Sequence, residues 1–247
     1  MNKIFVLTCL LCIAFSLNST AQGNEIDSLK AIVNNGKNDT NTVNALLELA
    51  TKYLSTNVQL TIDYAEQANV LSKKLRHSNG YALSYKTIAR GQFTQGDYVK
   101  ALQNYEYSLV VFDSIGDRKG SANILSNMGN IFFNKGDDVK ALELFLKSLK
   151  IAEEINDTLR MVTCMGNVGA VYALKTTTYK EALSYLLRAY TLSEAIKDDN
   201  SIGAITVNIG EIYYADGKLD SALYYYEISL KSVEGTENEP YTLNDIG

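Results

Sequence analysis

Apolar side chains recur along this chain with helical spacing, and the arrangement returns about every 40 residues. From Ile124 to Phe132 they stand three or four positions apart, which predicts an amphipathic helix. A second such helix follows from Ala141 to Ile151, after the turn at 135–137. Gly136 in that turn can adopt the left-handed conformation that ends a helix. The pattern therefore predicts pairs of antiparallel helices joined by short turns.

Small residues mark the middle of the first helix of each pair. An interior glycine costs a helix about 1 kcal/mol relative to alanine, so we expect a packing reason for each of them. At these positions the first helix should approach the second helix of its own pair. Four copies carry the marker, with steps of 40, 40 and 41 residues: Ala89, Gly129, Gly169 and Gly210. A second marker opens the following helix: Ala101, Ala141, Ala182 and Ala222. A weaker copy precedes them around Ala50, which makes five.

This pattern resembles the tetratricopeptide repeat (TPR) over about 200 residues. The resemblance rests on the small residue, the aromatic residue three or four positions later, the turn glycine, and the alanine that opens the second helix. It implies an all-α fold, a right-handed TPR superhelix of antiparallel helix pairs with a concave groove. The period of 40 residues exceeds the 34 residues of the common form. In this respect the chain is more similar to the longer-period TPR domains of kinesin light chains and bacterial Rap regulators. The proline that often follows the second helix is missing.

The repeat divides the chain into segments. Residues 1–21 form a predicted signal peptide, and residues 22–37 a capping helix with a linker. Five TPR units are expected over 38–237, and residues 238–247 align with the start of a sixth. We expect the units at these positions: 38–77, 78–117, 118–157, 158–198 and 199–237.

The first helix of each repeat lines the groove in the family, so candidate binding residues follow from their place in the repeat. Asparagine recurs two positions before the glycine, although it is a poor helix former. A row of side-chain amides, each able to donate and accept, can hold the backbone of an extended peptide. The alternative is that these asparagines cap or bridge neighbouring helices. The candidates are Thr87, Arg90, Asn127, Asn130, Asn134, Asn167, Asn208, Glu211 and Tyr214.

Composition argues against catalysis and against nucleic-acid binding. The net charge is −5, with no basic footprint for nucleic acid. His77 is the single histidine, and there is no Cys/His metal spacing, nucleophile motif or phosphate-binding loop. We therefore expect a scaffold that binds a protein or peptide, and neither an enzyme nor a cofactor-dependent protein. Cys164, the turn residues Asp97, Asp137 and Asp138, and most tyrosines of the second helices are expected to pack or to cap helices.

The N-terminal residues predict export. Lys3 precedes an apolar run from Ile4 to Phe15 that is too short to span a membrane, and small residues follow at 19–21. The mature chain is therefore expected in the periplasm or outside the cell, without a membrane span of its own. Lipidation at Cys12 is disfavoured because no small residue precedes it.

The context of the chain is open to two interpretations. Residues 24–50 resemble the exported TPR region of bacterial signalling proteins of the histidine-kinase type, in which a membrane helix and an output domain follow. The ending within a sixth first helix favours a piece of such a longer protein. The alternative is a free-standing exported assembly or adaptor factor. A membrane helix encoded after Gly247 would support the first, and an early stop codon the second.

Overall fold

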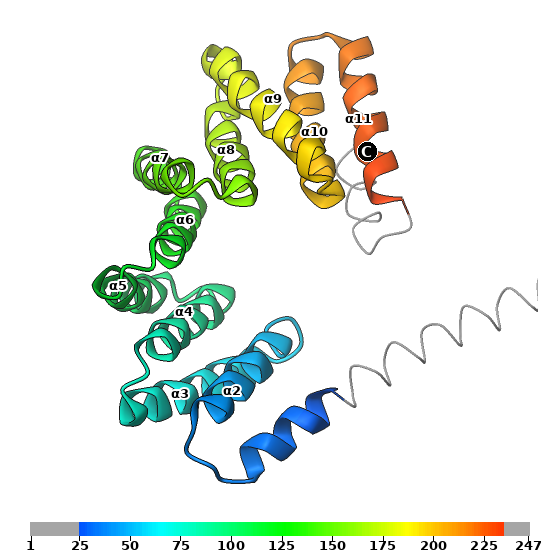
Figure 1. Cartoon of the computed structure of the whole chain (residues 1–247). Helices are drawn as coiled ribbons and strands as arrows, with labels where there is room; N and C mark the ends of the chain where they lie inside the picture. Colours follow the sequence, from blue (N-terminus) through cyan, green and yellow to red (C-terminus); the bar gives the residue numbers. More distant parts are fainter. Residues whose placement is uncertain (1–24, 235–247) are drawn as a thin grey trace, which may run out of the picture. The chain divides into compact units, whose positions relative to one another are not determined.

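The computed structural model describes residues 25–234, and the regular structure in this range is helical (Figure 1). The predicted signal peptide and the predicted start of a sixth repeat lie outside the described residues. The chain forms two compact units, which divide between Ile115 and Gly116.

The first unit contains two helix pairs preceded by a short helix over residues 25–34. Each helix packs against the next. Leu29 of the short helix is buried against Ala45 and Leu49, so this helix covers the apolar side of the first pair. The pairs are α2 (Thr40–Lys52) with α3 (Val58–Leu75), and α4 (Ser78–Thr94) with α5 (Tyr98–Ser114).

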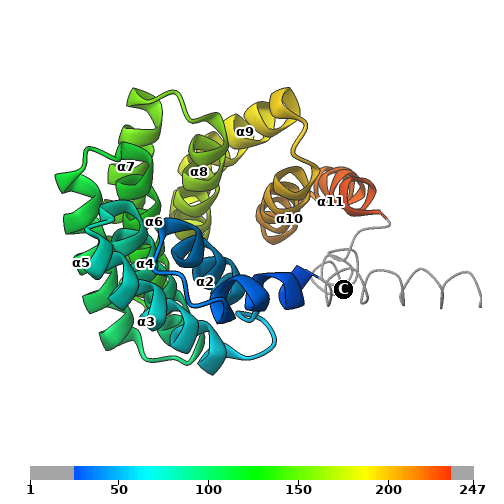
Figure 2. The same cartoon turned by 60° about the horizontal axis from the view of Figure 1, so that its bottom comes forward.

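The second unit contains three further pairs, and in Figure 2 the last two of its helices lie side by side. Its largest core cluster joins the middle pair to its neighbours through buried side chains such as Met165, Leu186 and Ile209. A 3-10 turn, η1 (Thr176–Thr178), replaces the glycine turn within the middle pair. The pairs are α6 (Arg118–Asn134) with α7 (Asp138–Glu154), α8 (Thr158–Ala173) with α9 (Tyr179–Ile196), and α10 (Asp199–Ala215) with α11 (Leu219–Val233).

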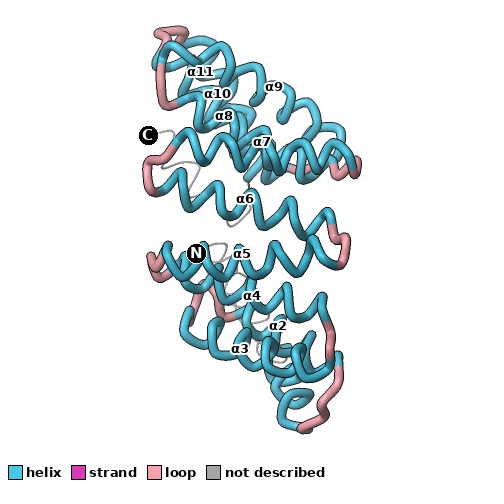
Figure 3. The backbone as a smooth tube through the Cα atoms, turned by 90° about the vertical axis from the view of Figure 1, so that its left-hand side faces the viewer, coloured by secondary structure: helices cyan, strands magenta, loops and turns pink. Residues whose placement is uncertain are grey.

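Short connections set the 40-residue period, and in Figure 3 they alternate between the two ends of successive helices. Helices α4 to α7 each have 17 residues, and three residues join each to the next. Positive φ angles occur at Gly96, Gly116 and Gly136, where the chain must turn sharply. The next helix then begins with an aspartate whose carboxylate accepts a hydrogen bond from the backbone N–H three residues on. These capping aspartates are Asp97, Asp117, Asp137, Asp157 and Asp198.

The marker glycines are close-packing sites, as the sequence predicts. A Cβ atom added to Gly129 would lie 2.6 Å from the Phe145 ring, and one added to Gly169 would lie 2.5 Å from Leu186 Cγ. At Gly210 the contact would be the Tyr226 ring, at 2.4 Å. In each case the neighbour lies on the second helix of the same pair, so the absent side chain lets the two helices approach.

Serines of the second helices fix the same pairs by hydrogen bonds. Ser148 lies in the core of its pair, and its hydroxyl donates to the carbonyl oxygen of Ala122 at 2.7 Å. Ser108 and Ser229 make the equivalent bonds in their own pairs, at 2.8 and 2.9 Å. Because these hydroxyls are buried, each bond satisfies a polar group that would otherwise cost stability.

The predicted all-α fold of antiparallel helix pairs is confirmed, with a correction at one turn residue. Tyr105 is buried, whereas Tyr107 and Tyr224 are 59% and 58% exposed and pack their rings against Tyr85 and Tyr225. Asp137 caps α7, whereas Asp138 is an acidic residue of its first turn and does not serve as the cap.

Candidate functional site

Three asparagines occupy equivalent positions on the first helices of the second unit. Asn127 lies on α6, Asn167 on α8 and Asn208 on α10, and all three are half-buried. Each precedes by two positions a glycine that packs inward. Because successive residues of a helix are turned by about 100°, the asparagines lie to one side of the packed stripe and keep contact with solvent.

Hydrogen bonds engage these asparagines to different extents. Asn127 Nδ2 donates to Asn123 Oδ1 at 3.0 Å, one turn earlier on α6. Asn167 Nδ2 donates to Ser126 Oγ at 3.4 Å and so bridges α8 to α6. The side chain of Asn208, in contrast, makes no hydrogen bond within the described part of the chain. Each side-chain oxygen of Asn167 and Asn208 is therefore available to accept from a partner.

A cavity of about 210 Å³ lies between α8 and α10, with Asn167 and Asn208 in its wall. Its lining residues all come from these two first helices. Val162 and Ile205 in its wall are buried apolar residues, and the other lining residues are small or carry hydroxyl or amide groups. The other lining residues are Val162, Thr163, Gly166 and Ala170 from α8, and Ser201, Ala204 and Ile205 from α10.

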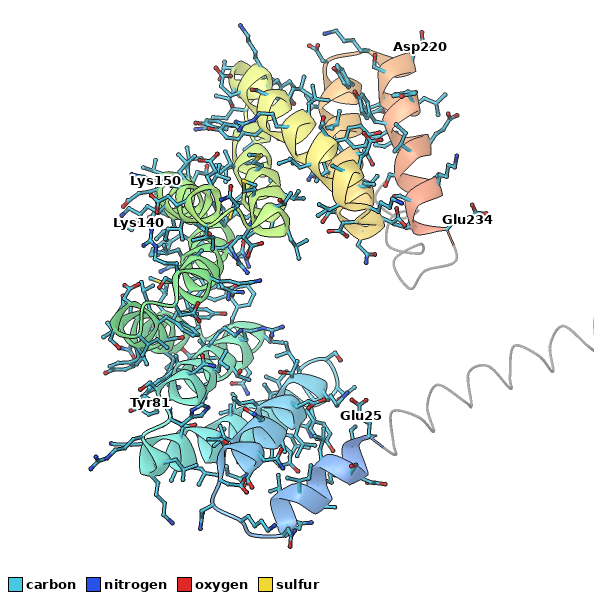
Figure 4. The ribbon with its side chains drawn as sticks, in the orientation of Figure 1. Glu25, Tyr81, Lys140, Lys150, Asp220 and Glu234 are labelled. Carbon is cyan, nitrogen blue, oxygen red and sulfur yellow. The ribbon has the colours of Figure 1, made fainter. Side chains whose placement is uncertain are left out.

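No charged side chain lines this cavity. In contrast, α7 carries charge on its exposed side: Glu143 pairs with Lys140 and Lys147, at 3.2 and 2.7 Å. Figure 4 shows Lys140 and Lys150 pointing away from the helices into solvent. The exposed side of α7 is therefore charged, whereas the residues that line the cavity between α8 and α10 are neutral.

A larger cavity, of about 550 Å³, lies in the first unit beside α2 and α3. Its wall carries Lys37 and Lys74 as well as Asp63 and Glu66. It has neither the neutral lining nor the repeated amides of the smaller cavity, so we place the candidate site between α8 and α10.

The remaining candidates fall around this site or in the other unit. On α6, Asn130 is half-buried and Asn134 is exposed, and on α10 both Glu211 and Tyr214 are exposed. None of the four lines the cavity, and Glu211 and Tyr214 lie near Tyr226 of α11.

Thr87 and Arg90 belong to α4 in the first unit. The Thr87 hydroxyl donates to the Leu83 carbonyl oxygen and the residue is 6% exposed, so it has little surface to offer a ligand. Arg90 is half-buried near Tyr105, whose pKa is raised by burial and slightly lowered by the Arg90 charge.

Cys164 is a core residue of the second unit. Cys164 is fully buried, and burial raises the pKa of its thiol, which donates to Ser148. A nucleophilic cysteine needs the opposite, a lowered pKa and access to solvent. Between residues 25 and 234 there is no group of three acidic, histidine or cysteine side chains placed to hold a metal. Likewise, none of the helices in that range is long and apolar enough to cross a membrane.

Sequence reasoning missed Gly166, Thr163, Ser201 and Ala204 as lining residues. Gly166 gave a usable signal, because it is an interior helix glycine that the other repeats do not share. Thr163, Ser201 and Ala204 gave no such signal, since small residues of these types are common on any helix.

The fold and the repeated small-residue packing define a TPR-like solenoid protein. Residues 120–195, which cover most of α6 to α9, match the family model described as a tetratricopeptide repeat. The comparison with curated protein sequences gave no match. The family match and the structural likeness together support a TPR protein.

Several solved structures share the fold at low identity. BtubC (BKLC) from P. vanneervenii is 16% identical, with a TM-score of 0.68 over 86% of this chain and 88% of that one. A Rap protein in complex with Competence and Sporulation Factor is 17% identical, with a TM-score of 0.70 over 93% and 71%. The quorum sensor NprR from B. thuringiensis, in its apo form, is 17% identical, with a TM-score of 0.58 over 93% and 70%.

Proposed function

We propose that this chain is a non-catalytic scaffold that binds a protein partner through an extended peptide segment. The observation that carries the proposal is the pair Asn167 and Asn208, which flank an open, neutral cavity on adjacent first helices. Because both amides line one cavity, a peptide that crosses α8 and α10 can present backbone groups to each of them in turn. The Rap protein of similar fold, solved with its bound factor, supports this kind of use for such a solenoid.

Binding to a peptide library tests the proposal. A display library of random 12-residue peptides is panned against the full chain, and the enriched peptides are synthesised. Two amide contacts worth about 0.5–1.5 kcal/mol each, about 1–3 kcal/mol together, correspond to a change in affinity of about 5- to 150-fold. The double variant Asn167→Ala/Asn208→Ala should therefore bind these peptides more weakly by about fivefold or more, while its thermal midpoint stays close to that of the wild type.

Gln103→Ala is the matched control, because it removes an exposed amide from the second helix α5. It should leave affinity unchanged. Equal affinities for the wild type and the double asparagine variant would contradict the proposal.

The setting we propose is the exported sensory or interaction region of a larger signal-transduction protein. Its support is sequence alone: the apolar leader over 1–21 and the resemblance of residues 24–50 to exported TPR regions. Expression of the full chain in a Gram-negative host, followed by N-terminal sequencing of the periplasmic fraction, tests export. A mature chain beginning at Gln22 is expected, and retention of Met1 in the cytoplasm would contradict it.

A further inference from the structure

Gly166 is an interior helix glycine without a packing reason. An added Cβ atom would meet one neighbouring atom, Ile205 Cγ1, at 3.9 Å, which is an ordinary contact distance. Three residues later on the same helix, Gly169 would clash with Leu186 at 2.5 Å. Glycine in a helix interior is unfavourable, and it also permits a close approach to a ligand. The surroundings of Gly166 fit a close approach to a ligand.

The space that a side chain at 166 would enter is the cavity between α8 and α10. Gly166, Ala170 and Ala204 all line it, and none of them has a side chain longer than a methyl group. Its volume of about 210 Å³ is below the range of about 300–1,000 Å³ typical of small-molecule sites. A cavity of this size accepts one side chain of a partner rather than a whole small ligand.

The lining indicates which side chain the cavity takes. Val162 and Ile205 form a buried apolar floor, and the groups at the edge are neutral hydroxyls and amides. A charged side chain would lose water there without meeting an opposite charge, which is costly. An aliphatic side chain would gain from the apolar floor.

We propose that this cavity is a specificity subsite that takes one aliphatic side chain of the bound peptide, and that Gly166 keeps it open. The inference rests on the proposed peptide-binding function. Asn167 and Asn208 hold the peptide backbone on either side, and the aliphatic side chain between them inserts over Gly166.

A cycle that combines a protein variant with a peptide variant tests the subsite. The probe is the tightest synthetic peptide from the 12-residue library, in which each position is replaced in turn by glycine and by lysine. One aliphatic position should stand out. Its replacement by glycine should weaken binding to the wild type about tenfold or more, and lysine should weaken it further.

Gly166→Leu fills the cavity and should weaken binding of the parent peptide about tenfold, with Gly166→Ala between it and the wild type. The glycine-trimmed peptide should bind wild type and Gly166→Leu equally, because it has nothing to insert. Ala195→Leu, on an exposed site of α9 outside the cavity, is the matched control and should bind as the wild type does.

Ala204→Leu fills the cavity from α10 and gives a second test should Gly166→Leu lose its circular-dichroism melting transition. The subsite is overturned when the cavity-filling variants bind the parent peptide as the wild type does, or weaken both peptides equally. If the asparagine variants still weaken binding in that case, the peptide-binding function stands and only the subsite fails. If panning enriches no peptide for the wild type, both proposals fail.

Discussion

Two glycines on one helix should respond in opposite directions to the same substitution. Gly166 and Gly169 both lie in the interior of α8, so replacement by alanine gives each the same gain in helix propensity, about 1 kcal/mol. Their surroundings differ. The new methyl group of Gly166→Ala enters open space, whereas that of Gly169→Ala meets the fully buried side chain of Leu186.

The distances set the magnitudes. At Gly166 the nearest contact is 3.9 Å, so the propensity gain remains and the free energy of unfolding should rise by about 1 kcal/mol. At Gly169 the added Cβ lies 2.5 Å from Leu186 Cγ and 2.7 Å from its Cδ2, inside any real contact distance. Overpacking of this kind costs about 1–3 kcal/mol. Because the propensity gain is common to both variants, the difference between them measures the packing cost alone.

Urea unfolding followed by circular dichroism measures both variants against the wild type. An unchanged dependence on denaturant concentration would show that the midpoints can be compared directly. In thermal unfolding, 1 kcal/mol corresponds to about 2–4 °C for a chain of this size. Gly166→Ala should therefore melt above the wild type, and Gly169→Ala should melt below Gly166→Ala by at least that amount. Gly169→Leu adds a larger side chain at the same place and should cost several times more, about 3 kcal/mol or above.

Two results would refute this reasoning. Equal stabilisation by both alanines would mean that Gly169 is not a close-packing site, which would remove the explanation for the repeat glycines. A loss of stability in Gly166→Ala would mean that the position is not open, and the cavity between α8 and α10 would lose its main support.

Three further outcomes are expected. Asn127→Ala combined with Asn167→Ala should weaken binding of the library peptides with little change in melting temperature; a large loss of stability would instead support the helix-bridging interpretation. Ser148→Ala should lower the free energy of unfolding by about 0.5–1.5 kcal/mol in urea, because the bond to the Ala122 carbonyl is lost; no change would contradict its role.

The third concerns pH. Burial alone would raise the pKa of Asp157. The Arg160 N–H and nearby positive charge nevertheless hold this pKa below its ordinary value. The stabilisation by ionised Asp157 is therefore complete above about pH 4, its pKa in the unfolded chain. It is lost as the pH falls through the lower pKa of the folded state. Asp157→Asn keeps a good cap and removes the charge. Urea unfolding between pH 7 and pH 2 should show a weaker loss of stability in this variant, and an identical pH profile would contradict the assignment.

The helix boundaries follow from local signals in the sequence. A helix begins at an aspartate whose carboxylate accepts a hydrogen bond from the backbone N–H three residues later. A helix ends where glycine or asparagine adopts the left-handed conformation. Asn156 follows this rule with a φ of 53°. Lys197, the C-cap of α9, has a φ of 56° although its residue type does not favour that conformation, so the residue type alone does not predict this turn.

The exposure of the tyrosines depended on which neighbours each helix acquired. Tyr105 and Tyr107 are two residues apart on α5, yet one is 2% exposed and the other 59%. Residues two apart on a helix lie about 200° from each other, so both cannot face the same partner. Without the partner in view, the sequence could not show which tyrosine would be buried.

By itself, the sequence determined the repeat, its period, the two helices of each copy and the small residues at which they meet. It could do so because helix periodicity, caps and turns act within a few neighbouring residues. Only the tertiary structure separated Gly166 from Gly169. Both read as interior glycines of one helix, and their positions lie only about 60° apart around its axis, yet their neighbours differ. Gly169 packs against Leu186, whereas Gly166 lines the cavity beside Asn167. This difference exists only once α9 and α10 have packed against α8.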